Sequence, residues 1–376
     1  MSPSDTSRRA DIDWIRVAAF GLLIIYHVGL VYAPWDWHVH SRYVFEPLRY
    51  LVLASNPWRL TLLFLVSGVA LRFMSRRRAP LEVARVRMAR LVPPFLFGVL
   101  VLVPPQSWLE AMDKGTWSQG LVAWWISEFS PSGLADGVPL NHLWFVLYIG
   151  IYSLIVLAIS AWPAALRAVE DLLSRILSGW GILACPILYL FGARQLWFAT
   201  YGISNHLETD WYNHAMSFGV FFLGFLLALR EPFWQRLERL RWGFFSLAMA
   251  ALTTLMTLEA RSPDPTHHVL AKNTMFALDQ WSMLCAVLGF GSRHLRTSDG
   301  PLLRYLTDAV FPCYLAHQTI LVAAIFVLKF QGVPPIWEAI LLLSITLGGS
   351  LLVYEIVRRI ELIRPLWGLK PARGKS

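Results

Sequence analysis

The chain is poor in charged residues and in cysteine. Charged side chains make up 15% of its 376 residues, whereas a soluble domain carries roughly 25%. This shortage, together with 56% hydrophobic residues, excludes a disordered chain, a coiled coil and an ordinary soluble enzyme. The three cysteines, Cys185, Cys285 and Cys313, lie in apolar runs, so we expect neither disulfides nor a cysteine metal site.

Motifs for nucleotide, serine-hydrolase and zinc chemistry are also missing. The histidine pairs His38/His40 and His267/His268 lack the spacing of metal ligands on a helix, so we predict no metal site. The net charge of +9 comes from basic residues at the ends of apolar runs. That pattern is typical of membrane topology and not of a nucleic-acid surface, so we expect no nucleic-acid partner.

Long apolar runs dominate what is present. A helix needs about 20 mostly apolar residues to cross a bilayer. The runs predict an all-α, polytopic membrane helix bundle of about ten transmembrane helices, forming a single domain over residues 1–376. The expected spans are 12–33, 57–75, 88–105, 142–162, 177–193, 212–230, 242–259, 273–290, 304–328 and 335–357.

The distribution of Lys and Arg predicts the orientation, because cytoplasmic segments are rich in both. Most basic residues fall on the side that holds both termini. We therefore expect cytoplasmic tails at residues 1–11 and 365–376. The basic residues on the outer side are few, and include Arg42, Lys114, Arg194 and Arg261.

The first expected span carries two ionisable residues on one stripe. Arg16 and His27 lie within about 20° of the same helix face and roughly 16 Å apart along the axis, and Asp13 is placed to pair with Arg16. Such groups cost about 2.5–3.5 kcal/mol in a membrane and are functional candidates. His317 lies at similar depth in the ninth span, so both histidines would face one polar cavity. The alternative is a snorkelling arginine and two hydrogen-bonded histidines without chemistry.

An arginine-rich segment follows the second expected span. Ser67 and Gly68 in that span permit close helix approach. The arginines then continue to Pro93-Pro94, where we expect the helix to break. Arginine binds phosphate bidentately, so the segment is a candidate for holding an anionic donor, with Arg72 and Arg76 nearest the membrane. The alternative is the positive-inside rule together with anionic lipid headgroups.

Three outer stretches mix aromatic and polar residues. They are 35–40, 124–125 and 205–214, and the first includes Trp37 and His38. Aromatic faces beside hydrogen-bonding side chains suit sugar rings. The alternative is an interfacial aromatic belt.

These residues together resemble the acyltransferase-3 family of integral membrane acyltransferases. The resemblance rests on Arg16-x10-His27, the run ending Ser67-Gly68, Arg76-x10-Arg87 and Arg90-Leu-Val-Pro93. Within the family, the chain is most similar to the glucan biosynthesis protein C group, the periplasmic-glucan succinyltransferases. That narrower likeness is carried by Trp37-His38-Val-His-Ser, His142-Leu-Trp144-Phe and Tyr314-Leu-Ala-His317.

The resemblance implies an enzyme of the bacterial inner membrane with no permanently bound cofactor. It would move a succinyl or acetyl group from cytoplasmic acyl-CoA to a hydroxyl of a glucan or other carbohydrate on the periplasmic side, with a glucan synthase as a candidate partner. A transporter or flippase for a glycan or acylated sugar is the alternative, although paired broken helices and inverted repeats are not evident.

The resemblance also implies roles for individual residues. His27 would be the general base, Arg16 would orient the donor or stabilise developing negative charge, and His317 would stabilise the oxyanion or position the acceptor. Direct transfer and transfer through an acyl-histidine are both open. The remaining candidates are Arg72, Arg76, Arg87 and Ser67 for the CoA donor, and Trp37, His38, His142 and Trp144 for the acceptor.

Overall fold

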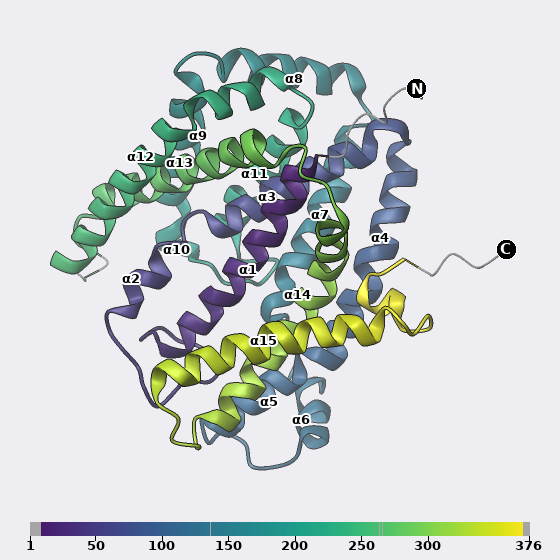
Figure 1. The fold of residues 1–376 in the computed structure, drawn as a ribbon, viewed down its shortest axis with the longest axis vertical. Coiled ribbons are helices and arrows are strands. Elements are labelled where there is room, and N and C mark those ends of the chain that lie inside the picture. Colours follow the sequence, from purple (N-terminus) through teal and green to yellow (C-terminus); the bar gives the residue numbers. More distant parts are fainter. Residues whose placement is uncertain (1–8, 136, 263, 265, 371–376) are drawn as a thin grey trace. The chain divides into compact units, whose positions relative to one another are not determined.

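The structure is a computed structural model that describes residues 9–370 apart from 136, 263 and 265. Within these residues every regular element is helical and no strand occurs (Figure 1). The predicted all-α class is confirmed. Of the expected tails, residues 1–8 and 371–376 lie outside the described residues, and the short helix η5 (Arg364–Trp367) occupies part of the second.

The helices gather into two compact units. The first takes the described residues up to Ala19, then Leu53–Ala84 and Ile151–Thr307, and the second takes Phe20–Val52, Arg85–Gly150 and the described residues from Asp308 onward. Five helices contribute residues to both units: α1 (Ala10–Tyr32), α2 (Leu48–Leu53), α4 (Pro80–Phe97), α7 (Trp144–Ile159) and α14 (Pro301–Leu328). The expectation of a single domain stays a prediction.

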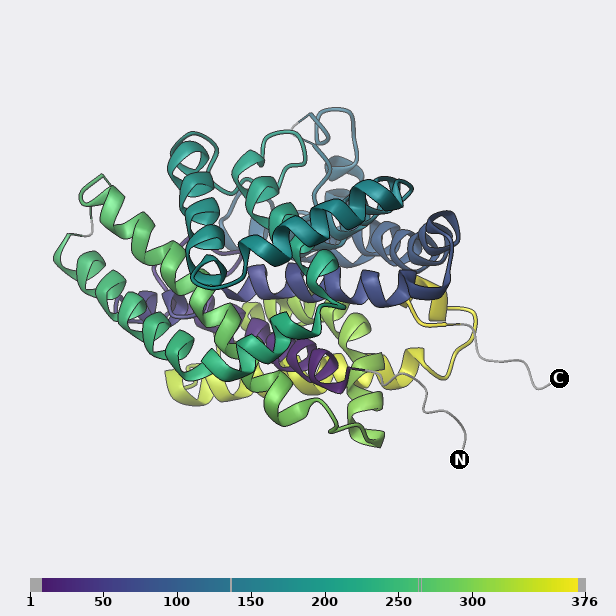
Figure 2. The same cartoon turned by 90° about the horizontal axis from the view of Figure 1, so that it is seen from above.

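The first unit is built around two helix pairs. α12 (Glu231–Arg261) and α13 (Val269–Leu295) lie side by side along their length (Figures 1 and 2). α3 (Arg59–Met74) packs against α11 (Trp211–Leu227). The unit also contains η1 (Ser75–Arg77), α8 (Pro163–Ile176), α9 (Gly181–Ala193), the π-helical η4 (Arg194–Phe198) and α10 (Ala199–Tyr201).

Glycines let the backbones of α3 and α11 touch. A Cβ atom on Gly68 would lie 1.9 Å from the carbonyl oxygen of Phe221, and one on Gly224 would lie 2.2 Å from that of Leu65. No side chain fits at either position, because both clashes are with backbone atoms. The close approach predicted at Ser67-Gly68 is confirmed.

The second unit adds shorter helices to its share of α1, α4, α7 and α14. These are α2 (Leu48–Leu53), the π-helical η2 (Gly98–Leu102), α5 (Pro104–Asp113), α6 (Leu121–Glu128) and η3 (Asn141–Leu143), followed by the long α15 (Pro335–Val357). α2 ends at the boundary between the units. The long outer connection expected from residue 106 to 141 is thus partly helical.

The predicted break at Pro93-Pro94 is wrong. Both prolines lie inside α4, which continues to Phe97. Proline removes an amide donor from the helix, and here the chain widens into η2 directly after α4, where the amide of Val103 donates to the carbonyl of Gly98 at 2.9 Å. The π-helical turn begins four residues after Pro94, and the helical path continues past both prolines.

Among the described residues, seven helical segments are long and apolar enough to cross a membrane. They are Ala10–Tyr32, Pro80–Asp113, Asn141–Ile159, Gly181–Tyr201, Glu231–Arg261, Pro301–Leu328 and Pro335–Val357. Each corresponds to an expected span. Large apolar side chains on them are exposed, such as Leu188 at 65% and Leu352 at 61%, as a lipid-facing surface requires.

The other three expected spans are helices with less favourable length or composition. α3 and α11 have 16 and 17 residues, about 24–26 Å at 1.5 Å per residue, which is shorter than the roughly 30 Å hydrocarbon core. α13 has 27 residues but carries Lys272, Asp279 and Arg293. The count of ten spans and the orientation of the termini therefore stay predictions.

Candidate active site

The second unit brings His27 of α1 and His317 of α14 into contact. His27 Nδ1 lies 3.1 Å from His317 Nε2, and both side chains are buried. The two rings are parallel within 5° with centroids 5.2 Å apart. The centroid distance is too long for face-to-face stacking, and the N–N contact is short. The two parallel rings therefore lie edge to edge. This is the geometry of an in-plane hydrogen bond.

The hydrogen-bond partners assign the tautomer of each histidine. His317 Nδ1 lies 2.5 Å from the carbonyl oxygen of Tyr314. A carbonyl only accepts, so this nitrogen carries the proton and His317 Nε2 is the acceptor. His27 must then donate from Nδ1, which leaves the lone pair of neutral His27 on Nε2. The chain therefore runs from His27 through His317 to the Tyr314 carbonyl.

Aromatic residues surround this histidine pair. Trp37 lies 5.1 Å from His27 between ring centroids, and His142 lies 5.2 Å from His317. His142 donates from Nε2 to the carbonyl of Leu315 at 3.2 Å. Trp144, the first residue of α7, packs against Tyr148 with ring centroids 5.1 Å apart. The structure thus places Trp37 and His142 against the histidine pair, while Trp144 belongs to the adjoining aromatic packing.

A second hydrogen-bond chain passes through His38. Gln318 donates from Nε2 to His38 Nε2 at 2.8 Å, so His38 carries its proton on Nδ1, which donates to the Glu110 carboxylate. Glu110 also accepts from Lys114 at 2.6 Å, and that hydrogen bond raises the pKa of the Lys114 ammonium. Exposure of the side chains increases outward, from 16% at His38 and 27% at Glu110 to 45% at Lys114.

Sequence reasoning did not single out Glu110 or Gln318 as site residues. Gln318 follows His317 directly, and Glu110 is a carboxylate at the end of an apolar run. Gln318, inside the expected span 304–328, is a signal of intramembrane polarity, whereas Glu110 lies beyond the expected span 88–105. The sequence did not show that His38 contacts both residues, because Glu110 and Gln318 lie 72 and 280 positions away from it along the chain.

Most of the remaining predicted donor residues lie in the first unit. Arg16 donates to Asp13 at 3.1 Å, as the spacing predicted. Arg72 donates to the buried carboxylate of Glu170 at 2.6 Å, so its charge is already compensated. Arg76 is exposed in η1. Ser67 is half-buried beside Gly68.

Arg87, in contrast, belongs to the second unit and is buried. The predicted donor set is therefore divided between the two units. Within the described residues, no three His, Cys, Asp or Glu side chains gather as metal ligands.

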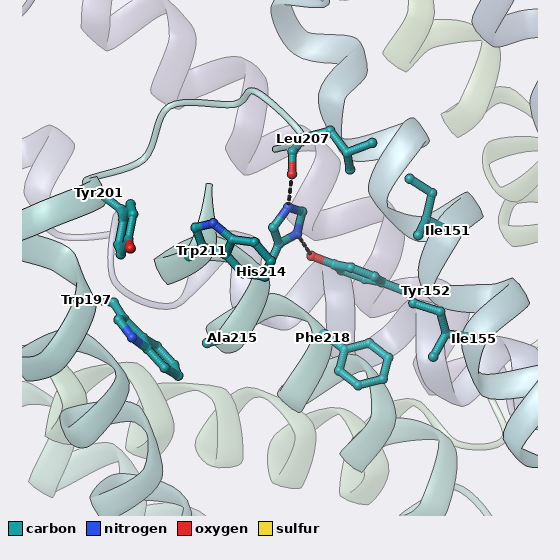
Figure 3. A pocket seen from close by; sticks show the side chains of 10 residues that line it. All are labelled: Ile151, Tyr152, Ile155, Trp197, Tyr201, Leu207, Trp211, His214, Ala215 and Phe218. Atoms are coloured by element: carbon teal, nitrogen blue, oxygen red, sulfur yellow. Dashed lines mark hydrogen bonds between the residues drawn. The ribbon is translucent and has the colours of Figure 1, made fainter. Parts of the chain in front are cut away.

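The first unit also contains a pocket of about 550 Å³ with aromatic walls (Figure 3). Three of its lining residues are joined by hydrogen bonds: Tyr152 donates to His214 Nδ1 at 2.8 Å, and His214 Nε2 donates to the carbonyl of Leu207 at 2.7 Å. The outer aromatic stretch 205–214 thus contributes wall residues to it. The lining is completed by Ile151, Ile155, Trp197, Tyr201, Trp211, Ala215 and Phe218.

Comparison with known proteins decides the family. Residues 9–355 match the acyltransferase-3 family model, described as an acyltransferase domain. The chain belongs to the acyltransferase-3 family. It is similar to the protein named "Glucans biosynthesis protein C" of Escherichia coli O1:K1 / APEC, with 23% identity over 99% of this chain and 97% of the relative.

The protein of the same name from strain UTI89 / UPEC shows the same identity and coverage. No solved structure matches the chain. The resemblance inferred from the motifs is thereby confirmed at both levels, the family and the glucan biosynthesis protein C group. Together with the seven apolar helices, it identifies a multi-pass membrane protein of an acyltransferase family.

Proposed function

We propose that the protein transfers an acyl group, succinyl or acetyl, from cytoplasmic acyl-CoA to a hydroxyl of a glucan on the periplasmic face of the bacterial inner membrane. In this account both termini are cytoplasmic, and α3, α11 and α13 join the seven apolar helices in the membrane. The relatives named for glucan biosynthesis support the acceptor class. The observation that carries the chemistry is the buried chain from His27 through His317 to the Tyr314 carbonyl.

His27 is the general base in this mechanism. Its Nε2 lone pair takes the proton of the acceptor hydroxyl while the hydroxyl oxygen bonds to the thioester carbonyl carbon. The resulting imidazolium is stabilised through its Nδ1–H bond to His317. When the C–S bond breaks, CoA leaves as a thiolate and takes the proton from His27. The thioester becomes an oxygen ester and CoA becomes a thiol, with no net release of protons.

The other predicted residues fit around this step. Trp37, against the His27 ring, offers a face for the acceptor sugar, with His38, His142 and Trp144 behind it. Arg76 is exposed and is the best-placed arginine of the first unit for a CoA phosphate, because Arg72 is occupied by Glu170. Arg16, Arg87 and Ser67 keep their proposed roles toward the donor. A glucan synthase is the proposed supplier of the acceptor.

Membrane vesicles of defined orientation test the proposal. Radiolabelled succinyl-CoA or acetyl-CoA is supplied at the cytoplasmic face, and label is sought on a glucan at the opposite face. We expect transfer with the wild type and its loss with His27→Ala, and the better donor names the acyl group. His267→Ala, which changes an exposed histidine outside the candidate site, is the matched control. Passage of unlabelled glucan without label transfer would support the alternative, an exporter.

A further inference from the structure

Arg194 is a half-buried arginine in the first unit whose described partners are all uncharged. It lies in η4, inside the apolar segment Gly181–Tyr201. Its Nε donates to Asn273 Oδ1 at 2.9 Å and its Nη1 donates to the Tyr212 hydroxyl at 3.1 Å. The guanidinium carbon lies 4.0 Å from the centroid of the Phe198 ring and 3.7 Å from that of Phe276, and two rings so close must flank it.

This environment differs from that of other arginines in the same unit. Several of them donate to a carboxylate, in the pairs Arg9–Asp11, Arg16–Asp13, Arg72–Glu170, Arg230–Glu170 and Arg296–Glu231. Among the residues that the structure describes, Arg194 has no carboxylate within ion-pair distance. A charged side chain in an apolar helical segment is by default a candidate for a functional site.

The donors around Arg194 outnumber the acceptors. A guanidinium has five N–H groups, and two of them are used by Asn273 and Tyr212. The Tyr212 hydroxyl accepts a hydrogen bond from Arg194, so its own proton can be donated to a further acceptor. The Tyr212 side chain is only 1% exposed. Asn273 in turn donates a hydrogen bond from Nδ2 to Gln195 Oε1 at 2.9 Å. One N–H group of Nη1 and both N–H groups of Nη2 therefore have no acceptor among the described residues.

We propose that Arg194 and Tyr212 form a binding site for an oxyanion that presents two oxygens, a carboxylate or a phosphate group. One oxygen accepts from Nη2 of Arg194 in a charge-assisted hydrogen bond, and the other accepts the Tyr212 proton. Phe198 and Phe276 hold the guanidinium plane in place. The anion comes either from an anionic lipid headgroup or from a soluble carboxylate or phosphate. This inference does not depend on the proposed acyl transfer.

Thermal unfolding of the purified full-length protein separates these sources. In micelles of dodecyl maltoside, which carries no oxyanion, the unfolding midpoint is followed while sodium succinate or inorganic phosphate is titrated. In a second series, phosphatidylglycerol is added to the micelles. A saturable rise with the soluble anions identifies a soluble ligand, and a rise with phosphatidylglycerol alone identifies a lipid headgroup. No rise with any of the three probes overturns the proposal.

Three variants locate the response. Arg194→Gln should abolish the rise. If that variant fails to fold, Arg194→Lys is used instead; it keeps the charge without the planar fork and should bind the anion more weakly. Tyr212→Phe keeps the ring and should lower affinity about tenfold, the value of one hydrogen bond to a charged group. Arg261→Gln, at an exposed arginine, is the control. An equal response in Arg194→Gln and Arg261→Gln contradicts the site.

Discussion

Replacement of His317 tests how much of the base strength of His27 depends on its partner. His317 accepts the Nδ1 proton of His27 at 3.1 Å and is itself held by the Tyr314 carbonyl at 2.5 Å. His317→Leu removes the acceptor, so the Nδ1–H of the imidazolium that forms in the transition state has lost its partner. A hydrogen bond to a charged group contributes about 1.5–3 kcal/mol, which corresponds to roughly a 10- to 150-fold fall in kcat.

His317→Gln gives the matched comparison. The glutamine Oε1 reaches the place of the imidazole Nε2 and accepts from His27, so this variant should retain more activity than His317→Leu. The assay is acyl transfer by purified protein at saturating donor, with thermal unfolding measured on the same samples. A loss smaller than about threefold in His317→Leu, or equal losses in the two variants, would refute the proposed chain.

Three further predictions concern packing, the second hydrogen-bond chain and the donor. Gly68→Ala should destabilise the protein by about 1–3 kcal/mol, because its Cβ would lie 1.9 Å from a backbone oxygen of α11. Gly243→Ala is the control and should leave the stability unchanged, because its Cβ meets nothing within 4 Å. Thermal unfolding of the two variants measures the difference. Glu110→Ala should raise KM for the acceptor several-fold, whereas Glu110→Gln, which still accepts from His38, should not; equal effects would contradict this positioning. Arg76→Gln should raise the KM for acyl-CoA about tenfold, and Arg77→Gln should raise it less. Identical KM values in the two variants would contradict a role of Arg76 in donor binding.

The sequence was sufficient for the fold class, the family and the two histidines. Apolar runs predict helices directly, and the Arg16–His27 stripe follows from helical spacing alone. The meeting of His27 with His317 joins residues 290 positions apart, yet it was anticipated because both lie at similar depth in spans that enter from the same side. The depth of a residue in the membrane can be predicted from its position within an apolar span.

Contacts set by lateral packing were out of reach. Nothing local shows that Arg72 meets Glu170, 98 positions away, and this contact changes which arginine is best placed for a phosphate. The continuation of α4 through Pro93 and Pro94 was missed because the rule for proline considers the lost hydrogen bond and not the tolerance of membrane helices for proline. Likewise, α3 and α11 are shorter than their apolar runs, because hydropathy does not fix where a helix ends.

The central claim is that His27 is the general base, and His27→Asn tests it most directly. The asparagine Nδ2 takes the place of the imidazole Nδ1 and keeps the donor bond to His317, while the nitrogen that takes the proton is gone. The measurement is the rate of acyl transfer from labelled acyl-CoA to glucan by the purified variant. Our account predicts a loss of 10²–10⁴-fold with an unchanged unfolding midpoint. A rate within a few-fold of the wild type would contradict it.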